Sequence, residues 1–561
     1  MTAAAHPGEA PAPTGFFSSD RFAGYLLTAA VLLPMLAFLV LPLSAILLYS
    51  LRGPGGIGLE NFTHTFGAPR FWTLVVNSVV MSVVSTVGTV VLAYGYAYGL
   101  ARAKVPFTGL WRIVALLPLF APSLVQAQGL ILLVGRNGVF NRFLGFDIDI
   151  YGFWGVVISN LLAAFPYAFL ILSAALAVAD GRLYESAEAL GARPLRIFRT
   201  VTLPATRYGI AAACFVSFTL VITDFGNPMV IGGDFNVLAT EVYNQVIGQA
   251  QFGLGAVIGV VLLLPAALGK IIEKRIARKQ HALITAQSKP LVIRPALGRD
   301  VAWSAFVVAV GVLIISVLAI VIVASFVRLW PYNMTLTLRH YEFDVQNGTA
   351  PIWNSIFVSF ASAIAGVALA GLCAIVVQKV RTPLSGPLSL MAILPSAVPG
   401  MVLGLGYVLA FNAAANPLNV LYGSFALIII LNVYYNHSQA FLITSTSLNQ
   451  IGGSFDEAST MLGASMTRTL GKITLPLIWP TLLGVGVFYF MRSMVSLSAV
   501  IFLINPSTQV AAVSVLQLSD RGAVNQAAAF SVCIMAVVVG CLALVRLVLV
   551  ATGHRNITLI R

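Results

Sequence analysis

The sequence predicts an all-α polytopic membrane protein with about 12 transmembrane helices in two parallel six-helix repeats. Charged residues make up 9% of the chain and apolar residues 59%, whereas soluble domains contain about 25% charged residues. Apolar runs such as residues 25–49 exceed the roughly 20 residues that cross a bilayer as a helix. These runs are continuous rather than alternating, which excludes a transmembrane β-barrel.

A polar segment divides the apolar runs into two groups of six. We expect a first transmembrane domain at 23–269, a linker at 270–301 and a second transmembrane domain at 302–550. Residues 1–22, rich in Ala and Pro, are predicted to be disordered, and 551–561 form the C-terminus. The predicted spans are 23–50, 72–100, 110–135, 152–178, 207–231, 252–269, 302–327, 353–378, 388–411, 422–446, 477–503 and 527–550.

The basic residues predict the orientation. We predict that both termini are cytoplasmic, because 24 of the 32 Lys and Arg residues then lie on the cytoplasmic side, seven lie outside and Arg492 lies within a span. The net charge of +14 then reflects basic residues that lie along the anionic cytoplasmic leaflet of the lipid bilayer. We expect no nucleic-acid partner, because no basic soluble domain is present to bind one.

The two halves repeat each other in sequence. Pro118 matches Pro395, Pro122 matches Pro399 and Gly129 matches Gly406, each 277 residues apart, while Asn160 lies 272 residues before its match, Asn432. Because each half contains an even number of spans, the two repeats share one orientation. Their pseudo-twofold axis therefore lies along the membrane normal, where we expect a substrate route.

One polar motif occurs once in each half, after the fourth span. The stretch "YESAEALGARPLRIFRTVTLP" covers 184–204, and "DEASTMLGASMTRTLGKITLP" covers 456–476. We interpret each copy as a helix–turn–helix lying flat at the membrane surface, with Gly191 or Gly463 ending its first helix in the left-handed conformation. Pro194 suits the first turn of the next helix and Ser465 could cap its counterpart. Duplication alone would also make the loops similar, but the constant spacing favours a function.

These two copies resemble the EAA loop of ATP-binding cassette (ABC) importer permeases of the type I fold, here in fused form. The resemblance implies a multi-pass protein of the bacterial inner membrane whose loops dock on two copies of an ABC ATPase. An extracytoplasmic solute-binding protein would be a further partner. The residues that would lie at the ATPase contact are Glu185, Ala187, Gly191, Glu457, Ala458 and Gly463.

Two further stretches resemble fused permeases for ferric iron and for 2-aminoethylphosphonate. They are "TDFGNPMVIGGDFNVLATEVYNQVIG" from Thr223 and "MVSLSAVIFLINP" from Met494. The resemblance implies that the chain forms the translocation pathway for one of these solutes.

The sequence contains no G-x-x-x-x-G-K-[ST] phosphate-binding loop and no recognisable catalytic set, so we expect no enzyme activity, no catalytic residue and no cofactor. No metal site is expected, since His437 is the only histidine in a predicted span. The four cysteines lie in apolar runs, and we interpret them as packing residues.

Two charged residues fall within the predicted fifth and eleventh spans. Asp224 and Arg492 would lie about one helical turn apart in depth, because Arg492 matches Leu220 across the repeat. Buried charges in a membrane are costly unless paired or hydrated. We favour a structural role, either as an ion pair that closes the pathway or as two independent residues that face a cavity, and the alternative is that both line the translocation path. The rival function is a 6+6 secondary transporter driven by an ion gradient, which would not explain the repeated loop.

Overall fold

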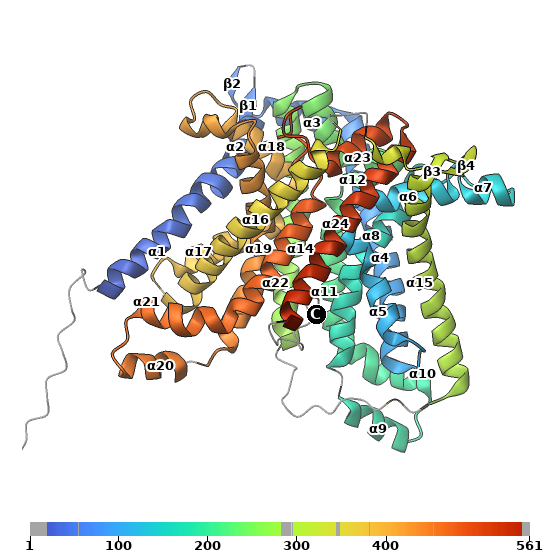
Figure 1. Cartoon of the computed structure of the whole chain (residues 1–561), viewed down its shortest axis with the longest axis horizontal. Coiled ribbons are helices and arrows are strands. Elements are labelled where there is room, and N and C mark those ends of the chain that lie inside the picture. Colours follow the sequence, from blue (N-terminus) through green and yellow to red (C-terminus); the bar gives the residue numbers. More distant parts are fainter. Residues whose placement is uncertain are drawn as a thin grey trace, which may run out of the picture.

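The computed structural model is almost entirely helical (Figure 1). It describes residues 19–53, 55–178, 180–281, 293, 295–343, 348–380, 382–452 and 454–551. Within these ranges the strands are confined to two antiparallel hairpins, which pair Arg52 with Ile57 and Val327 with Leu336. The hairpins are β1 (Arg52–Gly53) with β2 (Gly56–Ile57), and β3 (Val327–Leu329) with β4 (Asn333–Leu336).

The helices of the first half follow the predicted order of apolar runs. They are α1 (Ser19–Met35), the π-helical η1 (Leu36–Val40), α2 (Leu41–Leu51), α3 (Glu60–Gly67), α4 (Pro69–Arg102), α5 (Thr108–Leu116), the 3-10 turn η2 (Leu117–Phe120), α6 (Leu124–Val134), α7 (Val139–Leu144), α8 (Phe153–Ala177), α9 (Gly181–Ala189), α10 (Pro194–Ile197), the π-helical η3 (Phe198–Thr202), α11 (Leu203–Ile222), α12 (Gly226–Ile231), α13 (Leu238–Tyr243), the π-helical η4 (Asn244–Gly248) and α14 (Phe252–His281).

The second half repeats most of this order. Its helices are α15 (Leu297–Phe326), the 3-10 turn η5 (Arg339–Tyr341), α16 (Ala350–Ile375), the π-helical η6 (Val376–Val380), α17 (Ser385–Ile393), the 3-10 turn η7 (Leu394–Ala397), α18 (Gly400–Phe411), the 3-10 turn η8 (Pro417–Leu421), α19 (Phe425–Gln450), α20 (Ser454–Met461), α21 (Met466–Thr469), the π-helical η9 (Leu470–Thr474), α22 (Leu475–Met494), α23 (Ala511–Asp520) and α24 (Val524–Ala551).

Ten helices in the described part of the chain are long and apolar enough to cross a membrane, and two bent pairs would make 12. The bent pairs replace the straight spans predicted at 110–135 and 388–411: the chain turns by 107° between η2 and α6, and by 112° between η7 and α18. Ala121 and Val398, which precede Pro122 and Pro399, are extended. Proline disfavours a helical residue before it, so the repeated prolines cause both breaks.

The predicted fifth and eleventh spans, 207–231 and 477–503, were placed too far along the chain. The structure has continuous helices at Pro194–Ile222 and Met466–Met494. The polar motif ends in a helix that passes through η3 or η9 into the span without a break. The change from polar to apolar residues after each motif therefore indicates where the chain enters the membrane, but the helix itself begins earlier, inside the motif.

Some predicted segments fall largely outside the described residues. Of the predicted disordered segment 1–22, residues 1–18 lie outside, and α1 begins at Ser19, earlier than predicted. In the predicted linker 270–301, α14 continues to His281 and α15 begins at Leu297, while most residues between them lie outside the described ranges. Residues 552–561 of the predicted C-terminus lie outside them too.

The first span of each half packs against the other half: α2 contacts α18 and α15 contacts α6. Repeated glycines allow the close approach, because a Cβ at Gly129 would lie 2.2 Å from the Val317 carbonyl oxygen, and one at Gly406 would lie 2.7 Å from that of Pro42. The Tyr407 hydroxyl also donates a 2.6 Å hydrogen bond to the Phe38 carbonyl. The two halves are thus interlocked.

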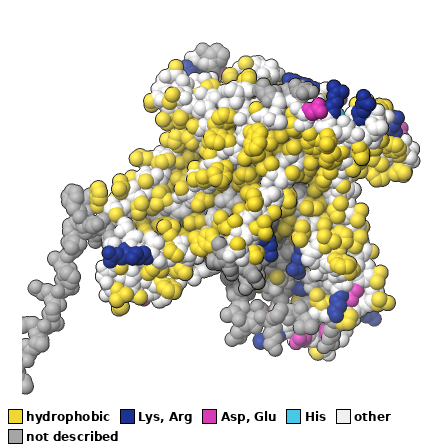
Figure 2. All heavy atoms as spheres, viewed as in Figure 1, with side chains coloured by type: hydrophobic (Ala, Val, Ile, Leu, Met, Phe, Trp, Pro, Cys, Tyr) yellow, Lys and Arg dark blue, Asp and Glu magenta, His cyan; other side chains and the backbone are white. Residues whose placement is uncertain are grey.

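The surface has the pattern of a membrane protein. In the view of Figure 2, hydrophobic side chains cover the middle of the molecule, while Lys and Arg gather toward its two ends. One end carries α9, α10, α20 and α21, and is called the motif end below; the other carries both β-hairpins and is called the hairpin end (Figure 1).

Candidate functional site

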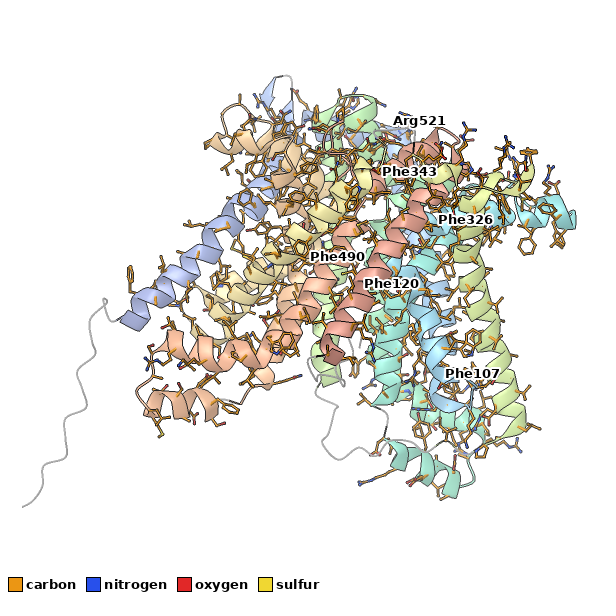
Figure 3. The ribbon with its side chains drawn as sticks, in the orientation of Figure 1. Phe107, Phe120, Phe326, Phe343, Phe490 and Arg521 are labelled. Carbon is orange, nitrogen blue, oxygen red and sulfur yellow. The ribbon has the colours of Figure 1, made fainter. Side chains whose placement is uncertain are left out.

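Two polar cavities lie side by side between the halves. The larger, of about 130 Å³, borders the break in the first bent pair, and the smaller, of about 100 Å³, borders the break in the second. Irregular backbone is tolerated at membrane depth where it lines a cavity. Phe120, just before the first break, and Phe490 in α22 lie at mid-height in Figure 3, between Arg521 and Phe107. The residues that line both cavities are Tyr167, Leu220, Thr223, Tyr435 and Arg492.

Asp224 lies where α11 has ended and the chain turns into α12. Its Oδ2 accepts a 3.1 Å hydrogen bond from the backbone N–H of Asn227, and the Ser123 side chain is a further hydrogen-bond partner. The Asn227 side chain in turn donates a 2.9 Å hydrogen bond to Asn160 in α8. Asp224 therefore supports the start of α12 while lining the larger cavity.

Arg492 in α22 has neutral partners. Its Nη1 donates a 3.1 Å hydrogen bond to the Tyr167 hydroxyl, and its Nε donates a 3.3 Å hydrogen bond to Asn436 Oδ1. Both contacts come from membrane-spanning helices, α8 and α19.

The ion pair that we favoured from the sequence is not formed. None of the ion pairs among the described residues includes Asp224 or Arg492, although both line the larger cavity. The ion pair was predicted wrongly because we assumed that the fifth span continued through Asp224, whereas two residues that face a cavity independently match the other form of the structural reading. Since α11 ends at Ile222, the carboxylate is turned toward the first residues of α12.

Sequence reasoning missed the neutral residues of this site. Tyr167, Tyr435 and Asn436 are separated from Arg492 by long stretches of chain, and each could equally pack in an ordinary helix interface. Ser123 had one available signal, since it directly follows the repeated Pro122.

The motif loops form a second candidate site at the motif end (Figure 1). Gly191 and Gly463 end their helices with φ of +71° and +70°, the left-handed conformation that we predicted for them. Pro194 occupies the first turn of α10, whereas Ser465 precedes α21 without a capping hydrogen bond from its side chain.

The loops present exposed side chains of two kinds. Glu185 and Glu457 are exposed, and neither belongs to an ion pair within the described ranges. Ala458, Gly191 and Gly463 are exposed and Ala187 is half-buried. Apolar side chains lie beside them, with Leu190 86% exposed and Met461 89% exposed. Large exposed apolar side chains that lie together are typical of surfaces that contact another protein or a membrane.

Comparison with known proteins matches both halves to one family. The family described as "Binding-protein-dependent transport system inner membrane component" matches residues 92–281 and again 366–552. The ferric transport system permease protein FbpB of Actinobacillus pleuropneumoniae is 28% identical over 531 residues, which cover 91% of this chain and 76% of that protein. A putative ferric transport system permease protein FbpB 1 of Haemophilus influenzae is 29% identical over 80% of this chain and 74% of its own length. A putative 2-aminoethylphosphonate transport system permease protein PhnU of Salmonella choleraesuis is 29% identical over 41% of this chain and 85% of its own length.

Proposed function

Because the chain belongs to the family of binding-protein-dependent transport system inner membrane components, we propose that it forms the complete membrane pathway of an ABC importer. The family matches the chain twice, so one chain supplies both permease domains, at 23–269 and 302–550. The two cavities that meet at Arg492 form the central part of that pathway. The double match also favours this function over a 6+6 secondary transporter.

The motif loops are the docking sites for two copies of a separate ABC ATPase. Three features support this: the loops lie at the same end of the molecule, their glutamates are exposed, and apolar residues form their tips. The motif end then faces the cytoplasm, as the distribution of basic residues predicts. A solute-binding protein docks at the hairpin end, on the extracytoplasmic side.

The transported solute is small and carries an anionic group. The observation that carries this proposal is that Arg492 lines both cavities without a carboxylate partner among the described residues. A guanidinium forms its strongest hydrogen bonds with carboxylate, phosphate or phosphonate oxygens. In 2-aminoethylphosphonate the phosphonate would bind Arg492 and the ammonium would approach Asp224.

Ferric iron is the second candidate. Two relatives that align over 91% and 80% of this chain are named for ferric transport. Asp224, Tyr167 and Tyr435 supply oxygen atoms to the larger cavity, and hard cations prefer oxygen ligands.

Uptake into proteoliposomes that contain this chain, its ATPase and its binding protein tests the proposal. We expect uptake of either labelled 2-aminoethylphosphonate or labelled ferric iron that requires both ATP and the binding protein. Uptake driven by an ion gradient after ATP depletion would overturn the importer in favour of the secondary transporter. Uptake of ferric iron in place of the phosphonate, or of a cationic organic solute, would overturn the assignment of an anionic solute and leave the ABC importer in place.

A further inference from the structure

Two cations occupy matched positions at the motif end of the second span in each half. Arg102 ends α4, and Lys379, 277 residues later, lies in η6 at the end of the span that begins with α16. Each cation reaches the residue that directly precedes a motif glutamate, Tyr184 in the first half and Asp456 in the second. These contacts join each motif loop to the second span of its own half.

In the first half the contact is buried and has neutral acceptors. Arg102 is 9% exposed and its Nη2 donates hydrogen bonds to the Leu176 carbonyl at 3.0 Å and the Tyr184 hydroxyl at 3.3 Å. Its guanidinium carbon lies 4.9 Å from the centroid of the Tyr184 ring. The Tyr184 hydroxyl donates a 3.0 Å hydrogen bond to Thr202. One residue pair thus connects α4, the end of α8, α9 and η3.

In the second half the contact is an ion pair. Lys379 Nζ lies 2.7 Å from Asp456 Oδ2, and the side chains are 13% and 39% exposed. Salt screens partly exposed ion pairs, whereas a buried cation–π contact with neutral hydrogen-bond acceptors is screened much less. The same position in the repeat therefore carries contacts of different chemistry.

We propose that these contacts are two latches that make each motif loop move with the second span of its half, and that the second latch is the one released by salt. Their role in coupling rests on the proposed docking of the ATPase. Each loop also continues directly into α11 or α22. At its other end each loop follows α8 or α19. A latched loop therefore transmits displacement to the second span as well as to the two spans that it joins along the chain, and an unlatched loop transmits it only to those two.

Spin labels at matched loop tips test the latches without any partner protein. The labels replace Leu190 and Met461, which have nearly equal exposure of 86% and 89%. The full-length chain is used in nanodiscs, after Ala has replaced the native cysteines Cys214, Cys373, Cys533 and Cys541. Raising NaCl from about 50 to about 500 mM shortens the Debye length several-fold. We expect the label at position 461 to become about twofold more mobile and the label at 190 to remain unchanged.

Variants assign these changes to the four residues. Lys379→Gln should mobilise the label at 461 at low salt and remove its salt response, and the exchange Lys379→Asp with Asp456→Lys should restore both. Arg102→Gln should mobilise only the label at 190, at every salt concentration. Equal salt responses at both labels, or an unchanged label at 461 in Lys379→Gln, would overturn the latches.

A second measurement separates the latches from the proposed function. In proteoliposomes with the ATPase and binding protein, Lys379→Gln should lower solute transported per ATP hydrolysed about twofold or more, and the charge exchange should recover it. A purely structural role would lower thermal stability without changing this ratio. If the labels respond as expected while the ratio stays constant, the role in coupling is wrong and the latches remain. If the labels do not respond while the loops still couple transport, the latches are wrong and the proposed function stands.

Discussion

The guanidinium of Arg492 in α22 donates a 3.1 Å hydrogen bond to the hydroxyl of Tyr167 in α8, so the two halves of the chain touch at the wall shared by both cavities. The length of this hydrogen bond changes whenever the two halves move relative to each other. It also orients a cation toward space that a solute could occupy.

Replacement of Arg492 by Gln should abolish most solute uptake. A charge-assisted hydrogen bond to solute contributes roughly 1.5–3 kcal/mol, so uptake should fall about 10- to 100-fold. Arg492→Lys keeps the charge without the planar fork and should be intermediate. Arg546→Gln, on the exposed surface of α24, is the control. Normal uptake by Arg492→Gln would contradict the proposal that Arg492 binds the solute.

Asp224 and Arg492 should behave as independent residues in a double-mutant cycle. Because they form no ion pair, the stability changes of Asp224→Asn and Arg492→Gln should add, with a coupling free energy below about 0.5 kcal/mol. Thermal unfolding of both single variants and the double variant measures this quantity. A larger coupling would reinstate the ion pair that the sequence suggested.

Reversal of charge in the motif should weaken the association of the chain with its ATPase. Glu185 is exposed and unpaired among the described residues, so Glu185→Lys should leave folding and membrane insertion unchanged while weakening ATPase docking. Copurification of the ATPase and substrate-stimulated ATP hydrolysis report the effect, and Glu457→Lys should reproduce it in the other half. Unchanged association in both variants would contradict the docking role.

Substitution of Gly463 by Val should disturb the motif through the backbone alone. A Cβ at Gly463 meets nothing within 4 Å, but φ is +70°, and the left-handed conformation costs about 1–2 kcal/mol for a residue with a Cβ. Transport should fall in Gly463→Val and less in Gly463→Asn, because Asn tolerates this conformation. Gly471→Val is the matched control: its Cβ also meets nothing, and its φ is ordinary.

The purified chain should bind no ATP and hydrolyse none. Its sequence has no phosphate-binding loop, and the nearest approximations, at Gly269–Lys270 and Gly471–Lys472, lack the following hydroxyl. Hydrolysis should begin only when the ATPase is added. Hydrolysis by the chain alone, after a mock purification has excluded contaminants, would refute the prediction.

The sequence predicted those features that depend on local pattern or on repetition. Long apolar runs predicted the helices. The constant spacing predicted the motif turns at Gly191 and Gly463, which depend only on a local backbone conformation with positive φ. The breaks were missed although Pro122 and Pro399 had been recognised as repeated. A single proline can also kink a continuous helix, and the hydropathy of the run does not distinguish the two outcomes.

The charged site could not be predicted in detail, because its geometry depends on where a helix ends. The end of α11 at Ile222 decides the direction of the Asp224 side chain, whereas the nearest helix breakers in the sequence, Gly226 and Pro228, lie beyond that end and inside α12. Tyr167 and Asn436 reach Arg492 only through tertiary packing. The latch residues were accessible in principle, since the repeat offsets align Arg102 with Lys379.

The exchange of first spans between the halves sets an order of events during synthesis. The face of α6 that receives α15 stays uncovered until the ribosome has delivered residue 326, well after the first half has entered the membrane. The partner of α2 comes later still, because α18 ends at Phe411. The helices made first are therefore surrounded by lipid on these faces until their partners are synthesised. On α6 the missing side chain of Gly129 leaves the space that α15 later fills. Because both halves belong to one chain, the partner helix emerges from the same ribosome, which shortens the interval before the two helices can pack.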